Sequence, residues 1–366
     1  MYPLIFFVRN VLLINGVPIS MKKFGSLSFG HYSGRATDGN GYTARNALQE
    51  AVELAKAADK LGVNGAYLRV HHYLPQHASP IPLLSAMAAV TKNLEVGTGV
   101  IDMRYENPLY LAEEAAALDL LSNGHVALGV SRGSPEAADR GWESFGYTGS
   151  TDPRGADIAH QHFDTFLRAV RGEPMATAAE DQYPAMYRPG AGLPVMPQSP
   201  GLDRRIWWGA GRRETAEWAA EQGVNLMSST LLTEATGEAF ADLQAQQLQH
   251  YHEAWKRAGH DWTPRVSVSR TIFPIIDGYD RKLYLGGQSK DGIGVIDGVN
   301  ATFGKTYAVE PDQLVEQLRN DAAVMDADTL MLTIPSQLGA EANKKILKSF
   351  ALYVAPELGW EPANQD

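Results

Sequence analysis

Through most of the chain, short runs of apolar residues alternate with longer segments in which apolar residues recur every three or four positions. The first apolar run is residues 23–30. The first helical segment, residues 44–62, places Leu48, Val52 and Ala55 near one stripe, which is the spacing of a buried helix face. The pattern therefore predicts repeated units of one strand followed by one helix.

Eight such units can be counted. We expect strands at residues 23–30, 65–72, 94–101, 125–133, 205–211, 224–230, 265–273 and 329–335. Strands that alternate with helices pair in parallel through right-handed crossovers, and eight units can close into a barrel. The sequence therefore predicts an α/β fold, the (β/α)8 TIM barrel. An open doubly wound sheet is the alternative, but no G-x-G-x-x-G follows the first strand.

Two segments interrupt the alternation, at about residues 134–204 and 277–310. They follow the fourth and the seventh predicted strands. Because the first contains many prolines and the second is rich in glycine, we expect insertions that are largely irregular. Loops after barrel strands open on the carboxyl-terminal face, where the active sites of this fold lie. Both insertions are therefore candidate lids.

Residues 21–366 are expected to form a single barrel domain. The apolar stretch in residues 1–20 is interrupted by Arg9 and Asn10, and it is too short to cross a bilayer. It also lacks the basic start and the small-residue cleavage site of a signal peptide. We expect residues 1–20 to be an extension outside the fold, with an additional strand or a barrel plug as the alternative.

Composition narrows the classes of partner. The chain is 44% hydrophobic and 20% charged, which is ordinary for a globular protein with a large core. A net charge of −10 argues against nucleic acid, because phosphate backbones bind basic surfaces. The chain has no cysteine, so disulfides, thiolate catalysis and Cys-ligated metals are excluded. A cytoplasmic location fits this composition, and we expect no membrane association.

A cation directly follows the fourth predicted strand, where Arg132 comes after an apolar run. A second arginine-bearing segment follows the fifth strand, on the same face of the predicted barrel. Together they predict an anion site, most simply for a phosphate. The alternative is that these arginines form surface ion pairs with nearby carboxylates, namely Glu136, Glu214 and Glu217. The presence of both segments on one face favours the anion site.

The second segment has the composition of a phosphate-binding turn. Gly209 and Gly211 would let the backbone approach a ligand closely, and Thr215 supplies a hydroxyl. Arg212 or Arg213 could add positive charge. The segment leads directly into a helix, whose first N–H groups point outward and attract anions.

Adjacent histidines end the second predicted strand. Neighbouring side chains on a strand point to opposite faces, so at most one of His71 and His72 faces the barrel mouth. This counts against a two-histidine metal site built from the pair. One inward histidine suits proton transfer near neutral pH, and a structural capping role is the alternative.

Four segments together resemble the bacterial luciferase-like superfamily of flavin-dependent monooxygenases, and they lie at residues 67–80, 94–136, 207–223 and 312–335. The resemblance extends over nearly the whole chain from Met21. Its most specific part is N-P-L-x-L-A-E-E-x-x-x-L-D-x-L-S-x-G, which begins at Asn107 and is followed by a strand that ends in Arg132 and Gly133.

The resemblance implies a (β/α)8 barrel with reduced FMN at its carboxyl-terminal mouth. It implies an acid/base role for His71 and a cis peptide bond between Gly99 and Val100, beneath the flavin ring. Arg212 stands where luciferase has a serine, so the implied contact there is made by the backbone. The full set of implied cofactor-binding residues is Gly99, Val100, Arg132, Gly209, Gly211, Arg212, Thr215, Met227 and Ser228.

The implied reaction uses reduced FMN and dioxygen to oxygenate a small organic substrate. The reduced FMN would come from a separate flavin reductase, and a homodimer is expected because it is common among similar proteins. No metal is implied. Three alternatives remain open: hydride transfer from a reduced deazaflavin, a metal-dependent barrel hydrolase, and a flavin-binding protein without catalysis.

Overall fold

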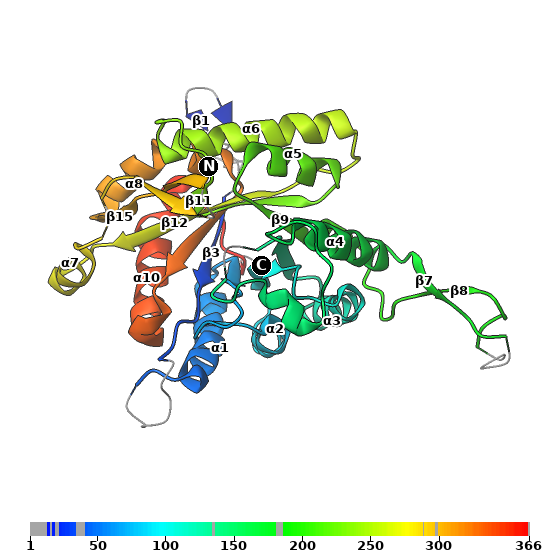
Figure 1. The fold of residues 1–366 in the computed structure, drawn as a ribbon. Coiled ribbons are helices and arrows are strands. Elements are labelled where there is room, and N and C mark those ends of the chain that lie inside the picture. The colour runs from blue at the N-terminus through cyan, green and yellow to red at the C-terminus, as the bar shows by residue number, and fades with distance from the viewer. Residues whose placement is uncertain are drawn as a thin grey trace, which may run out of the picture.

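The computed structural model describes residues 13–14, 17–18, 22–33, 41–133, 136–180, 186–287, 289–296 and 299–364. Within them, eight parallel strands form a barrel, and helices surround it (Figure 1). The barrel strands are β3 (Lys23–Ser28), β4 (Gly65–Leu68), β5 (Glu95–Asp102), β6 (Val126–Ser131), β9 (Ile206–Ala210), β10 (Asn225–Ser228), β12 (Val266–Pro274) and β16 (Thr329–Ile334). Pairing of β10 with β12 and of β16 with β3 closes the sheet, so the predicted (β/α)8 barrel is confirmed.

Helices follow the strands in the predicted order. They are α1 (Ala44–Leu61), α2 (Pro80–Ala88), α3 (Pro108–Leu121), α4 (Ala156–Val170), α5 (Arg213–Glu221), α6 (Phe240–Ala258), α8 (Pro311–Arg319), α9 (Ala322–Asp326) and α10 (Gly339–Tyr353). Among the described residues, no helix combines the length and the apolar character needed to cross a lipid bilayer.

Helix α1 shows how the sequence sets a helix and where the predicted stripe was wrong. Thr43 caps its first turn through a reciprocal pair of hydrogen bonds with Asn46. The buried face includes Leu54 and Ala58, whereas Leu48 is 45% exposed. Of the predicted stripe, Ala55 is buried and Val52 is partly buried, so only its start at Leu48 is wrong.

Two layers of packed side chains lie on the two faces of the barrel wall. Inside the barrel, six side chains from six strands form one cluster: Leu27, Tyr67, Ala127, Trp207, Met227 and Met331. Outside it, a much larger apolar cluster joins the strands to the helices. Alternation along each strand produces both layers, since Trp207 belongs to the inner cluster and Trp208 to the outer one.

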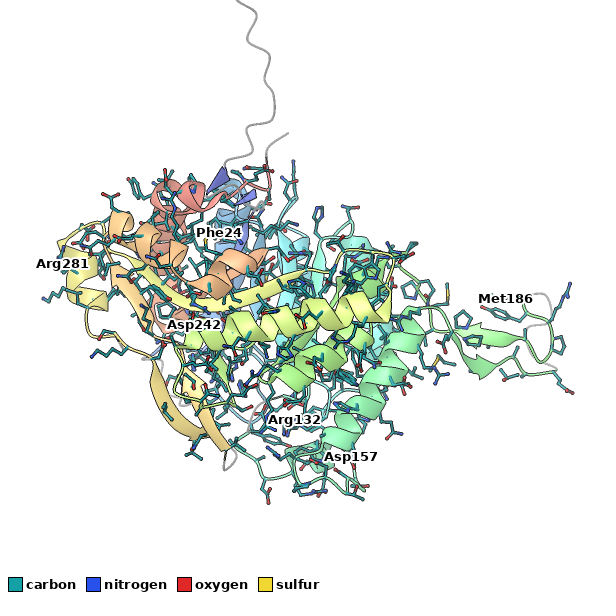
Figure 2. All side chains as sticks on the ribbon, turned by 90° about the horizontal axis from the view of Figure 1, so that it is seen from above. Phe24, Arg132, Asp157, Met186, Asp242 and Arg281 are labelled. Carbon is teal, nitrogen blue, oxygen red and sulfur yellow. The ribbon has the colours of Figure 1, made fainter. Side chains whose placement is uncertain are left out.

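The first predicted insertion is divided by a barrel helix. Helix α4 is the helix that follows β6, so the additional chain lies before and after it. The part before α4 contains the short helix η1 (Gly141–Phe145), and the part after it forms the antiparallel hairpin of β7 (Pro174–Thr177) and β8 (Gly192–Pro194). This hairpin projects away from the barrel (Figure 1), and Figure 2 labels Met186 near its end.

Part of the second insertion forms a small antiparallel β-sheet. Strand β13 (Gly292–Ile296) pairs with β14 (Val299–Phe303), which in turn pairs with β11 (Leu231–Leu232). Strand β15 (Thr306–Val309) continues the barrel sheet beside the end of β12. The short helix α7 (Gly278–Tyr284) precedes this sheet in the chain. The insertion thus reaches back to the carboxyl-terminal end of the barrel.

Near the chain start, β1 (Leu13–Ile14) and β2 (Val17–Pro18) pair only with each other and not with the barrel sheet. The expectation that residues 1–20 form an extension otherwise lies outside the described residues.

Candidate functional site

A cavity of about 370 Å³ opens at the carboxyl ends of the barrel strands. Every barrel strand contributes to its wall, either from within the strand or from the residues that directly follow it. Both insertions also contribute: Asp152 and Arg154 come from the first, and Ile296 and Val299 from the second, whereas His160 comes from the barrel helix α4. The cavity therefore lies where active sites of this fold are expected.

All of the residues predicted to bind the cofactor line this one cavity. They are Gly99, Val100, Arg132, Gly209, Gly211, Arg212, Thr215, Met227 and Ser228. They come from four strand ends and one helix start, and the chain between the first and the last spans more than a hundred residues. The fold therefore brings together the positions that the sequence analysis selected.

One side of the cavity is rich in arginine. Arg132 directly follows β6, and Figure 2 shows it near the start of α4, which the label of Asp157 marks. Arg154 and Arg212 line the same cavity. Arg132 and Arg212 follow the neighbouring strands β6 and β9, so these two cations and the start of α5 favour the binding of an anion on that side of the cavity.

The turn between β9 and α5 separates the two candidate arginines. Arg212 is the N-cap of α5, and its Nε donates a 2.8 Å hydrogen bond to Oγ1 of Thr233. Arg213 instead forms an ion pair with Glu234, with Nε and Oε2 2.8 Å apart. Arg212 therefore faces the cavity, and Arg213 is the surface ion pair.

The acidic residues proposed as alternative partners are used elsewhere. Oε1 of Glu217 lies 2.6 Å from Nδ1 of His250, and Oε1 of Glu136 lies 3.1 Å from Nδ1 of His71. Two of the three candidate carboxylates thus have other partners. The arrangement is consistent with the anion site.

Gly209 and Gly211 differ in whether the surrounding protein requires glycine at that position. A Cβ on Gly209 would lie 2.9 Å from Cγ1 of Val100, so β9 and β5 can approach only because this residue is glycine. A Cβ on Gly211 would meet its nearest protein atom, the carbonyl oxygen of Leu231, at an ordinary 3.6 Å. Gly209 is thus required by packing, whereas nothing in the surrounding protein requires glycine at position 211.

The floor of the cavity is apolar. It is formed by Leu27, Val100, Met227 and Met331, and the peptide bond between Gly99 and Val100 is cis, which confirms that prediction. A Cβ on Gly99 would lie 3.1 Å from Cδ1 of Leu27, so this part of the floor is closely packed. The apolar floor suits the flat ring of a flavin nucleotide, and the arginines beside it suit the phosphate.

Ser228 supports the site from behind. Its hydroxyl donates to Oε1 of Gln247, and the Gln247 amide donates to the carbonyl oxygens of Ala210 and Arg212 at 3.2 Å and 3.0 Å. The Ser228 side chain is buried. These contacts tie the end of β10 to the β9–α5 turn, so the Ser228 hydroxyl fixes the wall of the cavity.

A buried carboxylate holds the turn after Arg132. Asp102 forms an ion pair with Arg104, and a Cβ on Gly133 would collide with its Oδ2. Gly133 has a φ of +83°, a conformation that glycine adopts readily. Burial raises the pKa of Asp102 to about 6, although Arg104 opposes the shift. This packing thus requires the glycine that follows Arg132.

His71 does not lie where the sequence analysis expected it. Strand β4 ends at Leu68, so the alternation of a strand does not extend to His71 and His72, and both are buried. His71 is not among the residues that line the cavity; Arg69 is. Nε of Arg69 donates a 2.9 Å hydrogen bond to Nε2 of His71. His71 therefore stands behind the cavity wall, in contact with a residue that forms it.

His72 has a packing role in this structure. Its ring stacks on Tyr105 with centroids 4.1 Å apart, and it also meets the edge of Phe145. Burial lowers the pKa of His72 below its ordinary value.

The sequence analysis missed several lining residues. His160 stacks on Trp218 with centroids 4.6 Å apart, and its pKa is lowered by burial and then by Arg132. Arg154 and Asp152 lie in an irregular loop, where no periodic pattern marks them. Arg69 did carry a signal, because it directly follows an apolar strand, as Arg132 does.

Among the described residues, no group of three or more His, Asp or Glu side chains is placed to hold a metal ion.

Comparison with known proteins matches residues 23–278 to the family described as luciferase-like monooxygenase. The oxygenase component of a flavin-dependent trigonelline monooxygenase from Acinetobacter baylyi is 27% identical over 195 residues, which cover 52% of this chain and 50% of the relative. This match spans about half the length of that curated relative.

Two solved structures share the fold over most of the chain. The oxygenating constituent of 3,6-diketocamphane monooxygenase from Pseudomonas putida, in complex with FMN, has a TM-score of 0.64 and 18% identity, covering 92% of this chain and 98% of that one. The coenzyme F420 dependent tetrahydromethanopterin reductase from Methanopyrus kandleri has a TM-score of 0.61 and 14% identity, covering 93% and 100%.

Proposed function

Because the chain belongs to the luciferase-like monooxygenase family, we propose that it is a flavin-dependent monooxygenase that uses reduced FMN and dioxygen to oxygenate a small organic substrate. The observation that carries the proposal is the cavity itself. It combines an arginine-rich end, which suits a phosphate, with a closely packed apolar floor, which suits a flat aromatic ring.

In this proposal, the arginines bind the phosphate and the apolar floor supports the ring. Arg132, Arg154 and Arg212 would hold the FMN phosphate, with Thr215 and the start of α5 as further donors. Val100 and Met227 would support the ring. When bound, reduced flavin supplies the electrons for the activation of dioxygen.

The protein would also keep water away from the reacting atoms. The apolar floor offers water no hydrogen-bond partners, and Ile296 and Val299 from the second insertion add apolar cover to the wall. Exclusion of water strengthens electrostatic interactions and suppresses side reactions. The second insertion is therefore proposed as the lid, and the part before α4 contributes polar groups to the anion end.

A role in catalysis for His71 remains a prediction. Arg69 is a permanent donor, so Nε2 of His71 is an acceptor in this arrangement and the proton lies on Nδ1, which faces Glu136. His71 reaches the cavity through Arg69, and any contribution to the reaction would pass through that contact.

Partners are proposed on the same basis. The trigonelline relative is named an oxygenase component, which supports a separate reductase as the source of reduced FMN for this chain. A homodimer is proposed from the resemblance.

Hydride transfer from a deazaflavin is the second candidate, because the F420-dependent reductase shares the fold over almost the whole chain. The two candidates differ in the cofactor that is retained. The protein is incubated with FMN and, separately, with F420, then dialysed, and the absorbance spectrum of the retained cofactor is recorded. FMN retention, followed by oxygen consumption when an NADH-dependent reductase supplies reduced FMN, supports the monooxygenase. Retention of F420 alone favours hydride transfer, and retention of neither contradicts both.

A further inference from the structure

His160 is a titratable residue of the cavity wall with no role in the proposed function. It comes from helix α4, four residues after Ala156, which lines the cavity as well. Residues four apart lie on one face of a helix, so the first turns of α4 present this face to the cavity. On α5, Thr215 lines the cavity and Trp218 follows it three residues later, again on one helix face.

The ring of His160 lies between α4 and α5, close to Arg132. It stacks on Trp218 of α5 with centroids 4.6 Å apart, and it meets Trp208 edge-on at 5.9 Å. Helix α4 follows β6 and α5 follows β9, and these two strands are neighbours in the sheet. Figure 2 shows Arg132 near Asp157, which lies one turn before His160 on α4. The ring thus borders the side of the cavity that is assigned to the phosphate.

Stacking on Trp218 fixes one face of the His160 ring and leaves its edge to other groups. The His160 side chain is exposed, and neither ring nitrogen has a hydrogen-bond partner among the described residues. An anion in the cavity can therefore accept a hydrogen bond from this ring.

Two charges act on the His160 ring in addition to burial. Burial lowers the pKa of His160, the cation Arg132 lowers it further, and Asp152 raises it. The Asp152 carboxylate is engaged by the backbone, since its Oδ1 accepts hydrogen bonds from the N–H groups of Arg154 and Ala156 at 2.7 Å and 3.2 Å. A phosphate dianion beside the ring would add negative charge and so favour the protonated form of His160.

Carboxylates on α4 and α5 have other partners. Asp157, one turn before His160, accepts a 2.9 Å hydrogen bond from the N–H of Thr151. Oε1 of Glu217 on α5 lies 2.6 Å from Nδ1 of His250. These two carboxylates therefore do not compete with a phosphate for the His160 ring.

We propose that His160 binds the phosphate of FMN as a cation and thereby favours FMN over riboflavin. A protonated imidazole donates a charge-assisted hydrogen bond to a phosphate oxygen, and stacking on Trp218 holds the ring for this contact. This inference rests on the proposed function, because it takes the anion in this part of the cavity to be the phosphate of FMN.

The first test compares FMN with riboflavin, which has the same ring system and no phosphate. In His160→Phe, the aromatic ring still stacks on Trp218 but has no nitrogen. At about pH 6, where histidines titrate, the Kd for FMN should rise about ten-fold, while the Kd for riboflavin stays within two-fold of the wild-type value. His160→Gln keeps a neutral donor, so its loss of FMN affinity should be smaller. Quenching of flavin fluorescence measures both Kd values.

His162→Phe is the matched control on the same helix. Nδ1 of His162 lies 2.7 Å from the carbonyl oxygen of Met103, and His162 is not among the residues that line the cavity. Its replacement should leave the Kd values for FMN and riboflavin unchanged. A thermal melt shows that each variant is folded.

The second test measures the charge of His160 by NMR. The His160 ring signal is the one that the spectrum of His160→Phe lacks, and its chemical shift is followed with pH. Saturating FMN should raise the pKa of His160 by about one unit, whereas riboflavin should leave it unchanged.

The proposal fails if His160→Phe weakens neither flavin, or if it weakens FMN and riboflavin equally. A pKa of His160 that FMN leaves unchanged would overturn its binding as a cation. Failure of the wild-type protein to bind either flavin contradicts the proposed function instead. In that event, the NMR titration with inorganic phosphate still decides whether His160 receives an anion, since the pKa either rises or stays the same.

Discussion

Arg132 and Gly133 have different roles at the end of β6. Gly133 has a positive φ and leaves room for Asp102, and its N–H donates a 2.8 Å hydrogen bond to Oγ of Ser131. These contacts set the backbone at the end of β6. The direction in which Arg132 leaves the strand is thus fixed by its neighbours, and Arg132 lines the cavity.

Arg132→Ala should weaken FMN binding by about ten-fold or more. A charge-assisted hydrogen bond contributes roughly 1.5–3 kcal/mol, which corresponds to that range of affinity. Quenching of FMN fluorescence measures the Kd. Arg213→Ala is the matched control, because Arg213 pairs with Glu234 and should leave the Kd unchanged. Equal affinity of wild type and Arg132→Ala would refute the phosphate assignment.

His71→Ala should retain FMN, since the residues that line the cavity are elsewhere. Turnover should fall by roughly 10²–10⁴-fold if His71 takes part in proton transfer. If His71 acts only by positioning Arg69 in the cavity wall, the KM for the substrate should rise while kcat changes little. Steady-state kinetics with reduced FMN supplied by a reductase separate the two.

His72→Ala is the control for that experiment. His72 stacks on Tyr105, so its loss should lower stability at most. Should His71→Ala lose its cofactor or unfold, with normal turnover per bound flavin, the residue is structural and its predicted role in catalysis is wrong.

At the scale of elements, the sequence predicted what local periodicity controls. The strands and most helices follow from apolar runs and helical spacing, and Arg132 and Gly211 were found because they directly follow such runs. His71 was misplaced because β4 ends at Leu68, three residues before it, and alternation stops with the strand. His160 was missed because it reaches the cavity from a helix whose position depends on the whole barrel.

The turn between β9 and α5 allows a paired test of two glycines. In Gly209→Ala, the new Cβ would crowd Val100, and overpacking of this kind costs about 1–3 kcal/mol of unfolding free energy. In Gly211→Ala, the nearest protein atom lies at an ordinary contact distance, so stability should be nearly unchanged. FMN binding should nevertheless weaken several-fold if the backbone approaches the phosphate there.

Thermal melts and FMN titrations of both variants decide between these effects. Equal loss of stability in both would contradict the separation of a packing glycine from a ligand-facing one. Unchanged FMN affinity in Gly211→Ala would remove position 211 from the proposed phosphate site.

At the scale of the whole molecule, the barrel has two chemically different ends. The carboxyl end holds the cavity, whereas the amino end has a network of partly buried polar groups. Glu95 at the start of β5 accepts hydrogen bonds from Arg265 at 2.6 Å and from the Tyr67 hydroxyl at 2.7 Å. Arg265 also lies 4.6 Å from the ring centroid of Trp207. This network joins strands on opposite sides of the barrel and belongs to folding rather than to the site.

Glu95→Gln should therefore lower stability without changing FMN affinity. Burial alone would raise the pKa of Glu95, but Arg265 and the hydrogen bond from Tyr67 together lower it below its usual value. A carboxylate whose pKa is lowered on folding stabilises the protein above its unfolded pKa, about 4.3, and the contribution is lost as the pH falls through the folded value. Urea unfolding should show a deficit of about 1.5–3 kcal/mol at pH 7, because charge-assisted hydrogen bonds are lost while Arg265 keeps its contact with Asp328, and the deficit should shrink below about pH 4. A deficit that stays constant with pH would assign the effect to packing, and a changed Kd for FMN would mean that the two ends of the barrel are coupled.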